Sequence, residues 1–202
     1  MVAPLPVSEP TAPVPQPQPV RERGVLAWNV AALLTAAATV VGSLWLSLGM
    51  ELRACPLCYY QRSFVMGAAA VLLMAMLTEA RQSASVSLMA LPLAMAGLGV
   101  AIWHVYLETI GLEGMPKLEC PQGIFGLGTA PQQSLAAHVL LFAILTVASL
   151  RRPVAVVAIV LGALLAFASV KSAAPMPRPT PEEYQKPPVI CRPSLPPAQP
   201  GP

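Results

Sequence analysis

The sequence predicts an all-α membrane protein, a polytopic helix bundle with a four-helix core and a fifth, C-terminal transmembrane helix. Hydrophobic residues make up 55% of the 202 residues, charged residues only 10%, and the mean hydropathy is +0.64. A chain this apolar does not suit a water-soluble domain with a polar surface. The net charge of +3 is spread over loops and tails without a basic cluster, so we expect no nucleic-acid partner.

Five apolar segments approach or reach the length of roughly 20 residues that a helix needs to cross the hydrocarbon core of a bilayer. They are Val25–Leu48, Tyr59–Leu77, Leu88–Ile110, Ser134–Leu150 and Val154–Val170. The connections between them are short, as expected for neighbouring antiparallel helices. The fifth segment is at the short end of the range, which leaves a half-inserted helix as an alternative.

The composition divides the chain into four parts. Residues 1–24 form a proline-rich N-terminal tail that we expect to be disordered, because proline cannot continue a regular helix. Residues 25–150 form the four-helix core, and residues 151–173 the fifth transmembrane helix. Residues 174–202 form a second proline-rich tail, which carries Cys191 and for which extended or disordered chain is expected.

The basic residues in the short loops favour a cytoplasmic N-terminus, because cytoplasmic loops are enriched in Lys and Arg. With five spans, the C-terminus is then outside. The residues compared are Arg21, Arg23, Arg81, Arg151 and Arg152 on the cytoplasmic side, and Arg53, Arg62 and Lys117 on the other.

All four cysteines fall on the same predicted face of the membrane. Cys55 and Cys58 lie in the first loop, Cys120 in the third loop and Cys191 in the C-terminal tail. An even number of thiols on one face suggests two disulfides in an oxidising compartment such as the periplasm. Both disulfides could be static cross-links. A ring closed by a two-residue spacing removes little chain entropy, however, so the first pair is better suited to exchange.

The octapeptide Cys-Pro-Leu-Cys-Tyr-Tyr-Gln-Arg stands at the start of the second apolar segment. Pro56 suits the first turn of a helix, and Cys58 then lies near the helix N-terminus, which favours a thiolate. Arg62 follows Cys58 at i+4, on the same helix face, where its charge would stabilise that thiolate or an anionic acceptor beside it. The alternative is that Arg62 is an interfacial anchor.

This octapeptide, at the start of an apolar helix, resembles the signature of the disulfide bond formation protein B family of quinone-coupled membrane thiol oxidases. The resemblance extends over about Val25–Leu150 and includes a cysteine in the second outer loop. It implies a thiol:quinone oxidoreductase of the bacterial inner membrane that uses ubiquinone or menaquinone. The partner would be a periplasmic thioredoxin-like dithiol oxidase, which the enzyme reoxidises to support disulfide formation. Neither a metal nor a flavin is implied.

The resemblance also assigns roles to individual residues. Cys55 and Cys58 would form the pair that is reoxidised by quinone, with Cys58 nearest to the quinone and Arg62 beside it. His104 resembles a family histidine placed at the quinone, although an interfacial structural histidine is the alternative. The family carries both cysteines of its second pair in the second outer loop, whereas this chain has only Cys120 there. The resemblance therefore pairs Cys120 with Cys191, and all four cysteines would be catalytic.

Two other interpretations remain open at this point. A vitamin K epoxide reductase-like protein also combines a four-helix bundle, a CxxC motif and a quinone, but it places the motif near the end of a later helix. A membrane scaffold or accessory subunit with purely structural disulfides is the second alternative. Rapid quinone reduction by the purified protein would distinguish an enzyme from such a scaffold.

Overall fold

The structure, a computed structural model, describes residues 19–78, 83–112, 116–149, 152–176 and 179–194. The long helices in this part of the chain are α1 (Pro19–Leu48), α2 (Pro56–Leu77), α3 (Ala84–Thr109), α4 (Ala130–Ser149) and α5 (Val154–Ser172). All of them are long and apolar enough to cross a membrane, which confirms the predicted all-α membrane bundle. The short elements are β1 (Leu118–Glu119), η2 (Ile124–Gly126), η3 (Glu183–Gln185) and β2 (Arg192–Pro193).

The helices extend beyond the apolar segments that predict them. Helix α2 begins at Pro56 rather than Tyr59, and α4 begins at Ala130 rather than Ser134. Hydropathy detects only the apolar part of a helix, whereas the polar first turn is helical as well. Arg81 and Arg151, which entered the comparison of loop charges, lie outside the described residues, as do residues 1–18 of the predicted N-terminal tail.

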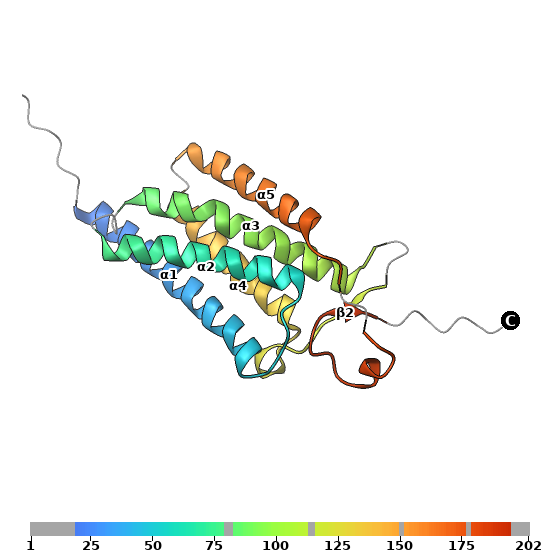
Figure 1. Ribbon diagram of the computed structural model, residues 1–202. Coiled ribbons are helices and arrows are strands. Elements are labelled where there is room, and N and C mark those ends of the chain that lie inside the picture. The colour runs from blue at the N-terminus through green and yellow to red at the C-terminus, as the bar shows by residue number, and fades with distance from the viewer. Residues whose placement is uncertain (1–18, 79–82, 113–115, 150–151, 177–178, 195–202) are drawn as a thin grey trace, which may run out of the picture.

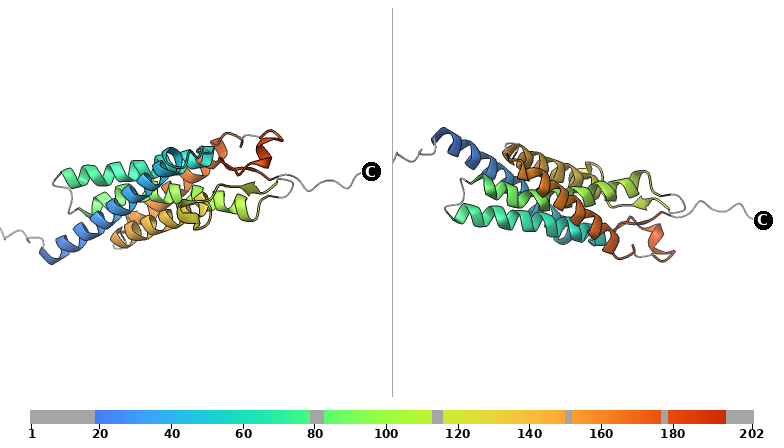
Figure 2. Two further views of the ribbon diagram at one scale, coloured as in Figure 1. Left: turned by 90° about the horizontal axis from the view of Figure 1, so that it is seen from below. Right: turned by 90° about the horizontal axis from the view of Figure 1, so that it is seen from above.

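Helices α1 to α4 form a four-helix bundle, and α5 packs on its outside. Helix α1 packs against α2 and α4, and α3 packs against the same two helices and against α5. The ribbon views show α5 running along α3 (Figures 1 and 2). Because consecutive helices run in opposite directions, the α1–α2 connection, the α3–α4 connection and the C-terminal tail meet at one end of the bundle (Figure 1). We call this the cysteine end, since it carries all four cysteines.

Small residues let α5 approach α3 closely. A Cβ atom added to Gly99 of α3 would lie 2.6 Å from the Cβ atom of Ala166 in α5. A Cβ atom added to Gly162 of α5 would lie 2.5 Å from the carbonyl oxygen of Pro92 in α3. Such contacts bring backbones together and favour van der Waals packing, which drives helix association in lipid. The close fit at these two glycines therefore holds α5 against α3.

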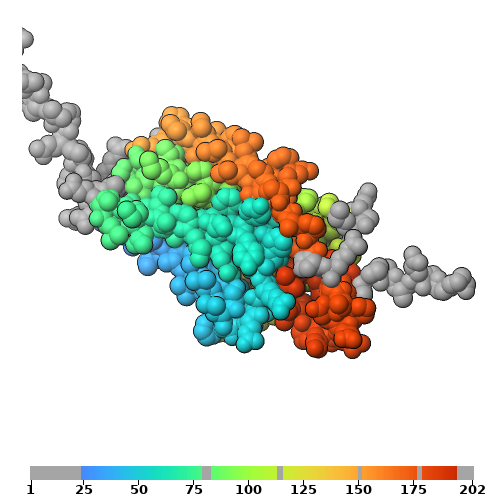
Figure 3. Space-filling view, in the orientation of Figure 1, coloured from blue at the N-terminus to red at the C-terminus, as the bar shows by residue number. Residues whose placement is uncertain are grey.

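The C-terminal tail folds against the cysteine end of the bundle. The backbone N–H of Arg53, in the α1–α2 connection, donates a hydrogen bond of 2.8 Å to the carbonyl oxygen of Val189. In the space-filling view the tail lies beside the chain that leads into α2 (Figure 3). The proline-rich composition predicts extended or disordered chain here, but residues 179–194 contain η3 and β2 and are held by hydrogen bonds to neighbouring segments.

The packing of α5 on α3 leads to a first prediction. Gly162→Val should destabilise the protein by about 1–3 kcal/mol, the usual cost of overpacking a close contact. The matched control is Gly24→Val in α1, because a Cβ atom at Gly24 meets nothing within 4 Å. Thermal unfolding of both variants in detergent measures the difference. Equal transition temperatures would show that the α3–α5 contact does not need glycine at this position.

Candidate redox site at the cysteine end of the bundle

The first cysteine pair lies at the N-terminus of α2. Cys55 is the N-cap residue, with an extended backbone, and Pro56 occupies the first turn. The Cys55 sulfur accepts a hydrogen bond of 3.2 Å from the backbone N–H of Cys58. Cys55 is joined to Cys58 in a disulfide, with 5.0 Å between their Cα atoms. One N–H group of the helix start therefore points at the Cys55 sulfur, whereas the sequence predicts that the helix start acts on Cys58.

The second pair joins the α3–α4 connection to the C-terminal tail. Strands β1 and β2 are antiparallel, and Glu119 lies opposite Arg192. Continuing this register by one position places Cys120 opposite Cys191. The structure joins these two cysteines in a disulfide, with 4.1 Å between their Cα atoms and a sequence separation of 71. Two short strands thus bring together residues that are far apart in the chain.

Arg192 holds the folded tail together. It is 6% exposed and forms a 3.2 Å salt bridge with Glu119. Its Nη1 and Nη2 atoms donate to the carbonyl oxygens of Glu183 and Lys186, at 2.6 and 3.1 Å. Its guanidinium also lies over the ring of Tyr184, 4.8 Å from the ring centroid.

A further hydrogen bond within the tail joins Thr180 to Glu183. The Thr180 backbone N–H donates to the Glu183 carboxylate, and this bond keeps the pKa of that carboxyl below its usual range.

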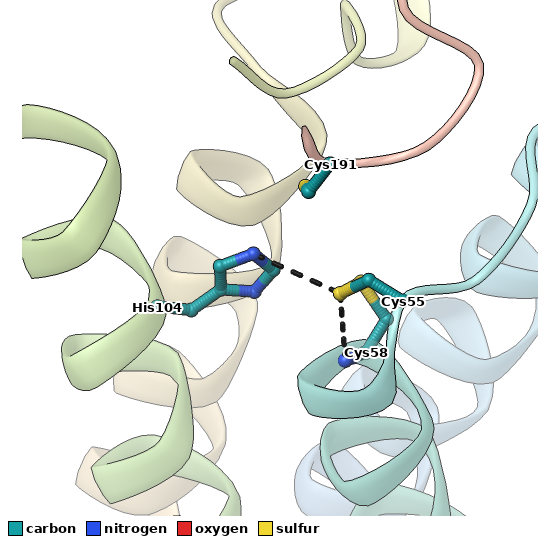
Figure 4. Close-up of side chains that lie close together, drawn as sticks. All are labelled: Cys55, Cys58, His104 and Cys191. Carbon is teal, nitrogen blue, oxygen red and sulfur yellow. Dashed lines mark hydrogen bonds between the residues drawn. A yellow bond between two sulfur atoms is a disulfide. The ribbon is translucent and has the colours of Figure 1, made fainter. Parts of the chain in front are cut away.

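His104 lies between the two disulfides. It is fully buried in α3, and its Nε2 atom is 3.8 Å from the Cys55 sulfur and 3.7 Å from the Cys120 sulfur. Figure 4 shows the ring facing the Cys55–Cys58 disulfide, with Cys191 of the tail close to both. One imidazole nitrogen is therefore within reach of a sulfur atom of each pair.

A chain of hydrogen bonds connects His104 to α4. The Nδ1 atom of His104 is 3.3 Å from the amide nitrogen of Gln61. The hydroxyl of Ser134 donates a 2.6 Å hydrogen bond to the amide oxygen of Gln61. The Nδ1 atom of His138 then donates to the carbonyl oxygen of Ser134 at 2.8 Å. These polar side chains are buried or half-buried in an apolar bundle, and each helps to orient the next.

A cavity of about 580 Å³ opens beside Cys58, between α1, α2 and α4. Most of its lining is apolar, and its polar residues include Gln61, Arg62 and His138. Cys191 also contributes to the lining, but His104 is not among the lining residues. The structure thus brings Cys58 and Arg62 to one cavity and places His104 at the sulfur atoms instead.

Arg62 points its guanidinium at α1. Its Nε atom donates to the Ser43 hydroxyl at 2.9 Å, and Nη2 donates to the Ser43 carbonyl oxygen and the Ser47 hydroxyl at 2.8 and 2.7 Å. Nη1 takes part in none of these bonds. The charge is therefore held in the cavity wall by polar groups, which offset the cost of placing it in a membrane span. None of these hydrogen bonds is to Cys58.

Comparison with known proteins identifies the family. The model of the family "Disulfide bond formation protein DsbB" matches residues 25–139, more than half of the chain. The chain belongs to the DsbB family. It is 33% identical, over 112 residues, to a protein of Chlamydia trachomatis serovar D named "Probable disulfide formation protein". That alignment covers 53% of this chain and 81% of the relative. No solved structure matches the chain.

Family membership makes this chain a disulfide-forming membrane protein of a bacterial inner-membrane family. The DsbB match contains Cys55, Cys58, His104 and Cys120, and it ends inside α4. Helix α5 and Cys191 lie beyond the matched segment. The second cysteine of the second pair therefore comes from a part of the chain that the family comparison does not cover.

Sequence reasoning missed several residues that position the site. Gln61 belongs to the octapeptide, and its place beside Cys58 and Arg62 was the available signal. Ser43 and Ser47 are spaced at i+4 in a mostly apolar helix, which puts them on one face. Nothing local in the sequence, however, indicates that this face meets Arg62. Ser134 carries no signal either, because its partner lies 73 positions away.

The network around Arg192 leads to a second prediction. Arg192→Met should speed the reduction of the Cys120–Cys191 disulfide by a small dithiol about tenfold or more, since a charge-assisted hydrogen bond contributes about 1.5–3 kcal/mol. Lys186→Met is the matched control, because it removes a positive charge from the same segment but its side chain is exposed. Reduction rates come from timed alkylation and mass spectrometry. Equal rates in the two variants would show that Arg192 does not hold the tail closed.

Proposed function

We propose that this protein is a thiol:quinone oxidoreductase that reoxidises a soluble, thioredoxin-like dithiol oxidase of the periplasm. Electrons pass from the partner to the Cys120–Cys191 pair, then to the Cys55–Cys58 pair, and finally to a membrane quinone. One observation carries the proposal: two disulfides meet at one end of a membrane bundle, and a sulfur of the first pair, Cys58, lines an apolar cavity.

The cavity suits a quinone. Its volume of about 580 Å³ falls within the roughly 300–1,000 Å³ of small-molecule sites, and its walls are largely apolar. Arg62 and Cys58 are the residues that would hold the quinone ring, whether of ubiquinone or menaquinone. His138 also lines the cavity, but its buried Nε2 atom faces Gly97 of α3, so no hydrogen bond from that atom to a quinone is proposed. A bound quinone would supply a sink for two electrons and two protons.

The proposed electron path follows from the order of the sulfur atoms. A thiolate of the partner attacks the Cys120 sulfur, forms a mixed disulfide and releases the Cys191 thiolate. Cys191 lies within 4.8 Å of both Cys55 and Cys58. It attacks Cys55, because the Cys58 thiolate is then released at the cavity wall, where electrons have to leave the chain.

Two further exchanges complete the transfer. The second thiol of the partner attacks its own mixed-disulfide sulfur and frees Cys120. Cys120 then attacks Cys191, which restores the second disulfide and releases Cys55. The partner has lost two electrons as a new disulfide, and Cys55 and Cys58 have gained them as two thiols.

His104 is proposed to act on the sulfur atoms rather than at the cavity. With the Gln61 amide N–H donating to Nδ1, the ring proton resides on Nε2, which faces Cys55 and Cys120. That proton can be shared with whichever of the two sulfurs carries the negative charge. A thiolate is costly in a buried, apolar site, so this hydrogen bond lowers the barrier to exchange.

The cysteine end is proposed to face the periplasm. Disulfides persist in that compartment, and the partner is soluble there. The N-terminus is then cytoplasmic, and α5 returns the C-terminal tail to the periplasmic side. Arg152, at the opposite end of the bundle, agrees with the excess of basic residues in cytoplasmic loops.

The third prediction tests the proposal that electrons leave the protein for the quinone through Cys58. Cys58→Ser should reduce quinone-dependent dithiol oxidation to the rate measured without protein, because the serine hydroxyl cannot form the disulfide. The control is Ser63→Ala on the same helix, an exposed position away from the cavity, which should keep the wild-type rate. Circular dichroism in detergent verifies that both variants are folded. Normal turnover by the Cys58 variant would contradict the proposed function.

The fourth prediction distinguishes a relay from a static cross-link at Cys120–Cys191. Non-reducing peptide mapping during turnover should show the Cys120–Cys191 peptide depleted and a transient peptide linking Cys191 to Cys55. The same sample before addition of the reduced dithiol is the reference. If Cys120–Cys191 stays fully oxidised while quinone is consumed, the bond is only structural and the path through the second pair is wrong.

A further inference from the structure

Four potential metal ligands converge at the cysteine end. Cys55, Cys58, Cys191 and His104 each offer one ligand atom, and these atoms all lie within 4.8 Å of one another. Cys55, Cys191 and His104 are buried and Cys58 is half-buried. They come from α2, from the tail and from α3, which surround one point in Figure 4. The proposed function uses these three sulfurs for exchange and His104 as a proton donor, and the same four side chains also form a compact set of potential metal ligands.

We propose that the fully reduced protein binds a thiophilic divalent metal ion, with Zn²⁺ as the reference, through Cys55, Cys58, Cys191 and the Nε2 atom of His104. Three thiolates and one imidazole form one of the usual closed tetrahedral zinc sites. With Zn–S bonds of about 2.3 Å, the ligand atoms of such a site are about 3.8 Å apart. Closing the site therefore takes shifts of about 1 Å from the arrangement in the structure.

The charge of the reduced cluster favours a cation. Reduction of both disulfides gives four thiols, and three of them, Cys55, Cys58 and Cys191, lie side by side in a largely buried site, where like charges repel one another strongly. The nearby Arg62 donates hydrogen bonds to Ser43 and Ser47 on α1 and not to these sulfurs. A divalent ion deprotonates the thiols that coordinate it and neutralises most of the resulting charge. Three protons are released to solvent, and no electrons are transferred.

The ring of His104 can present a free lone pair to the metal. Coordination through Nε2 requires the ring proton on Nδ1, which is 3.3 Å from the Gln61 amide. Turning that amide by a half-rotation places its oxygen at Nδ1 as an acceptor. Its nitrogen then donates to the Ser134 hydroxyl, which can accept as well as donate. Gln61 would thus orient the metal-bound histidine, as outer partners do in known zinc sites.

The site exists only in one redox state. In the oxidised protein the three sulfurs are held in disulfides and carry no thiolate. A metal ion would therefore be captured when both pairs are reduced, which occurs when electrons enter faster than they leave. The consequence for turnover rests on the proposed function: the bound ion would occupy both Cys191 and Cys58 and stop transfer until it is removed.

The test uses the full-length protein in detergent, without quinone or partner. Co²⁺ is titrated into protein reduced with a phosphine, and the visible absorption of tetrahedral, thiolate-bound Co²⁺ is recorded before Zn²⁺ is added to displace it. We expect one equivalent to bind the reduced wild type and none to bind the oxidised wild type. Equal binding by both redox forms, or an octahedral spectrum, would overturn the proposal without any mutation.

Variants then identify the ligands. Cys120→Ser is the matched control, because it removes a thiol close to His104 but leaves all four proposed ligands, so its affinity should equal that of the wild type. Cys191→Ser and His104→Phe should each weaken binding by about 100-fold or more, since the loss of an outer partner alone costs about 10–100-fold. Weakening by Cys120→Ser equal to that by Cys191→Ser would show that the ligand set is wrong. Absence of metal binding would contradict the metal site but not the proposed thiol oxidation, because the third and fourth predictions are tested without added metal.

Discussion

The close packing of α5 on α3 is the constraint on which the redox site depends. After four crossings the chain would end at the same side as its N-terminus, and Cys191 would be separated from Cys120 by the membrane. The fifth crossing returns the tail to the cysteine end. Gly99 and Gly162 have no side chains, so the backbones of α3 and α5 can approach each other closely at these positions. The second disulfide is therefore a consequence of helix packing some distance from the sulfurs.

The sequence was sufficient to predict the fold class but not the ends of the helices. Each span is marked by a long apolar segment, because lipid leaves the backbone no hydrogen-bond partners other than its own. Helix starts are polar and carry a different signal. Ser83 caps α3 by accepting a hydrogen bond from the N–H of Ser85, and this polar start precedes the apolar segment predicted from Leu88. Hydropathy cannot separate such a capped turn from the loop before it.

The part of the site that follows from local sequence was also predictable. A CxxC motif with proline at a helix start needs only the octapeptide to be recognised, and the structure places it at the beginning of α2. The position of His104 between Cys55 and Cys120 depends on the rotation of α3 in the bundle, which no single segment specifies. The folded tail depends on the β1–β2 register and on Arg192, whose partners are distant in sequence or in an irregular segment. The proline content of that segment predicts an irregular chain, but it does not reveal the hydrogen bonds that hold the chain in one conformation.

Because the tail is folded, the Cys120–Cys191 disulfide is not the only interaction that holds Cys191 at the cysteine end. In the chain-entropy model, closing a loop of this length is worth roughly 4 kcal/mol, so the bond stabilises the closed tail as strongly as a structural cross-link would. Cys191 and Cys120 are both buried, at 2% and 9% exposure, and the proposed relay has the incoming thiolate attack the more exposed Cys120. In the proposed relay, breaking the disulfide would remove that stabilisation, but Arg192 would still hold β2 beside β1. The released Cys191 thiolate would then remain next to Cys55, and the network around Arg192 would replace the covalent bond for as long as the exchange lasts.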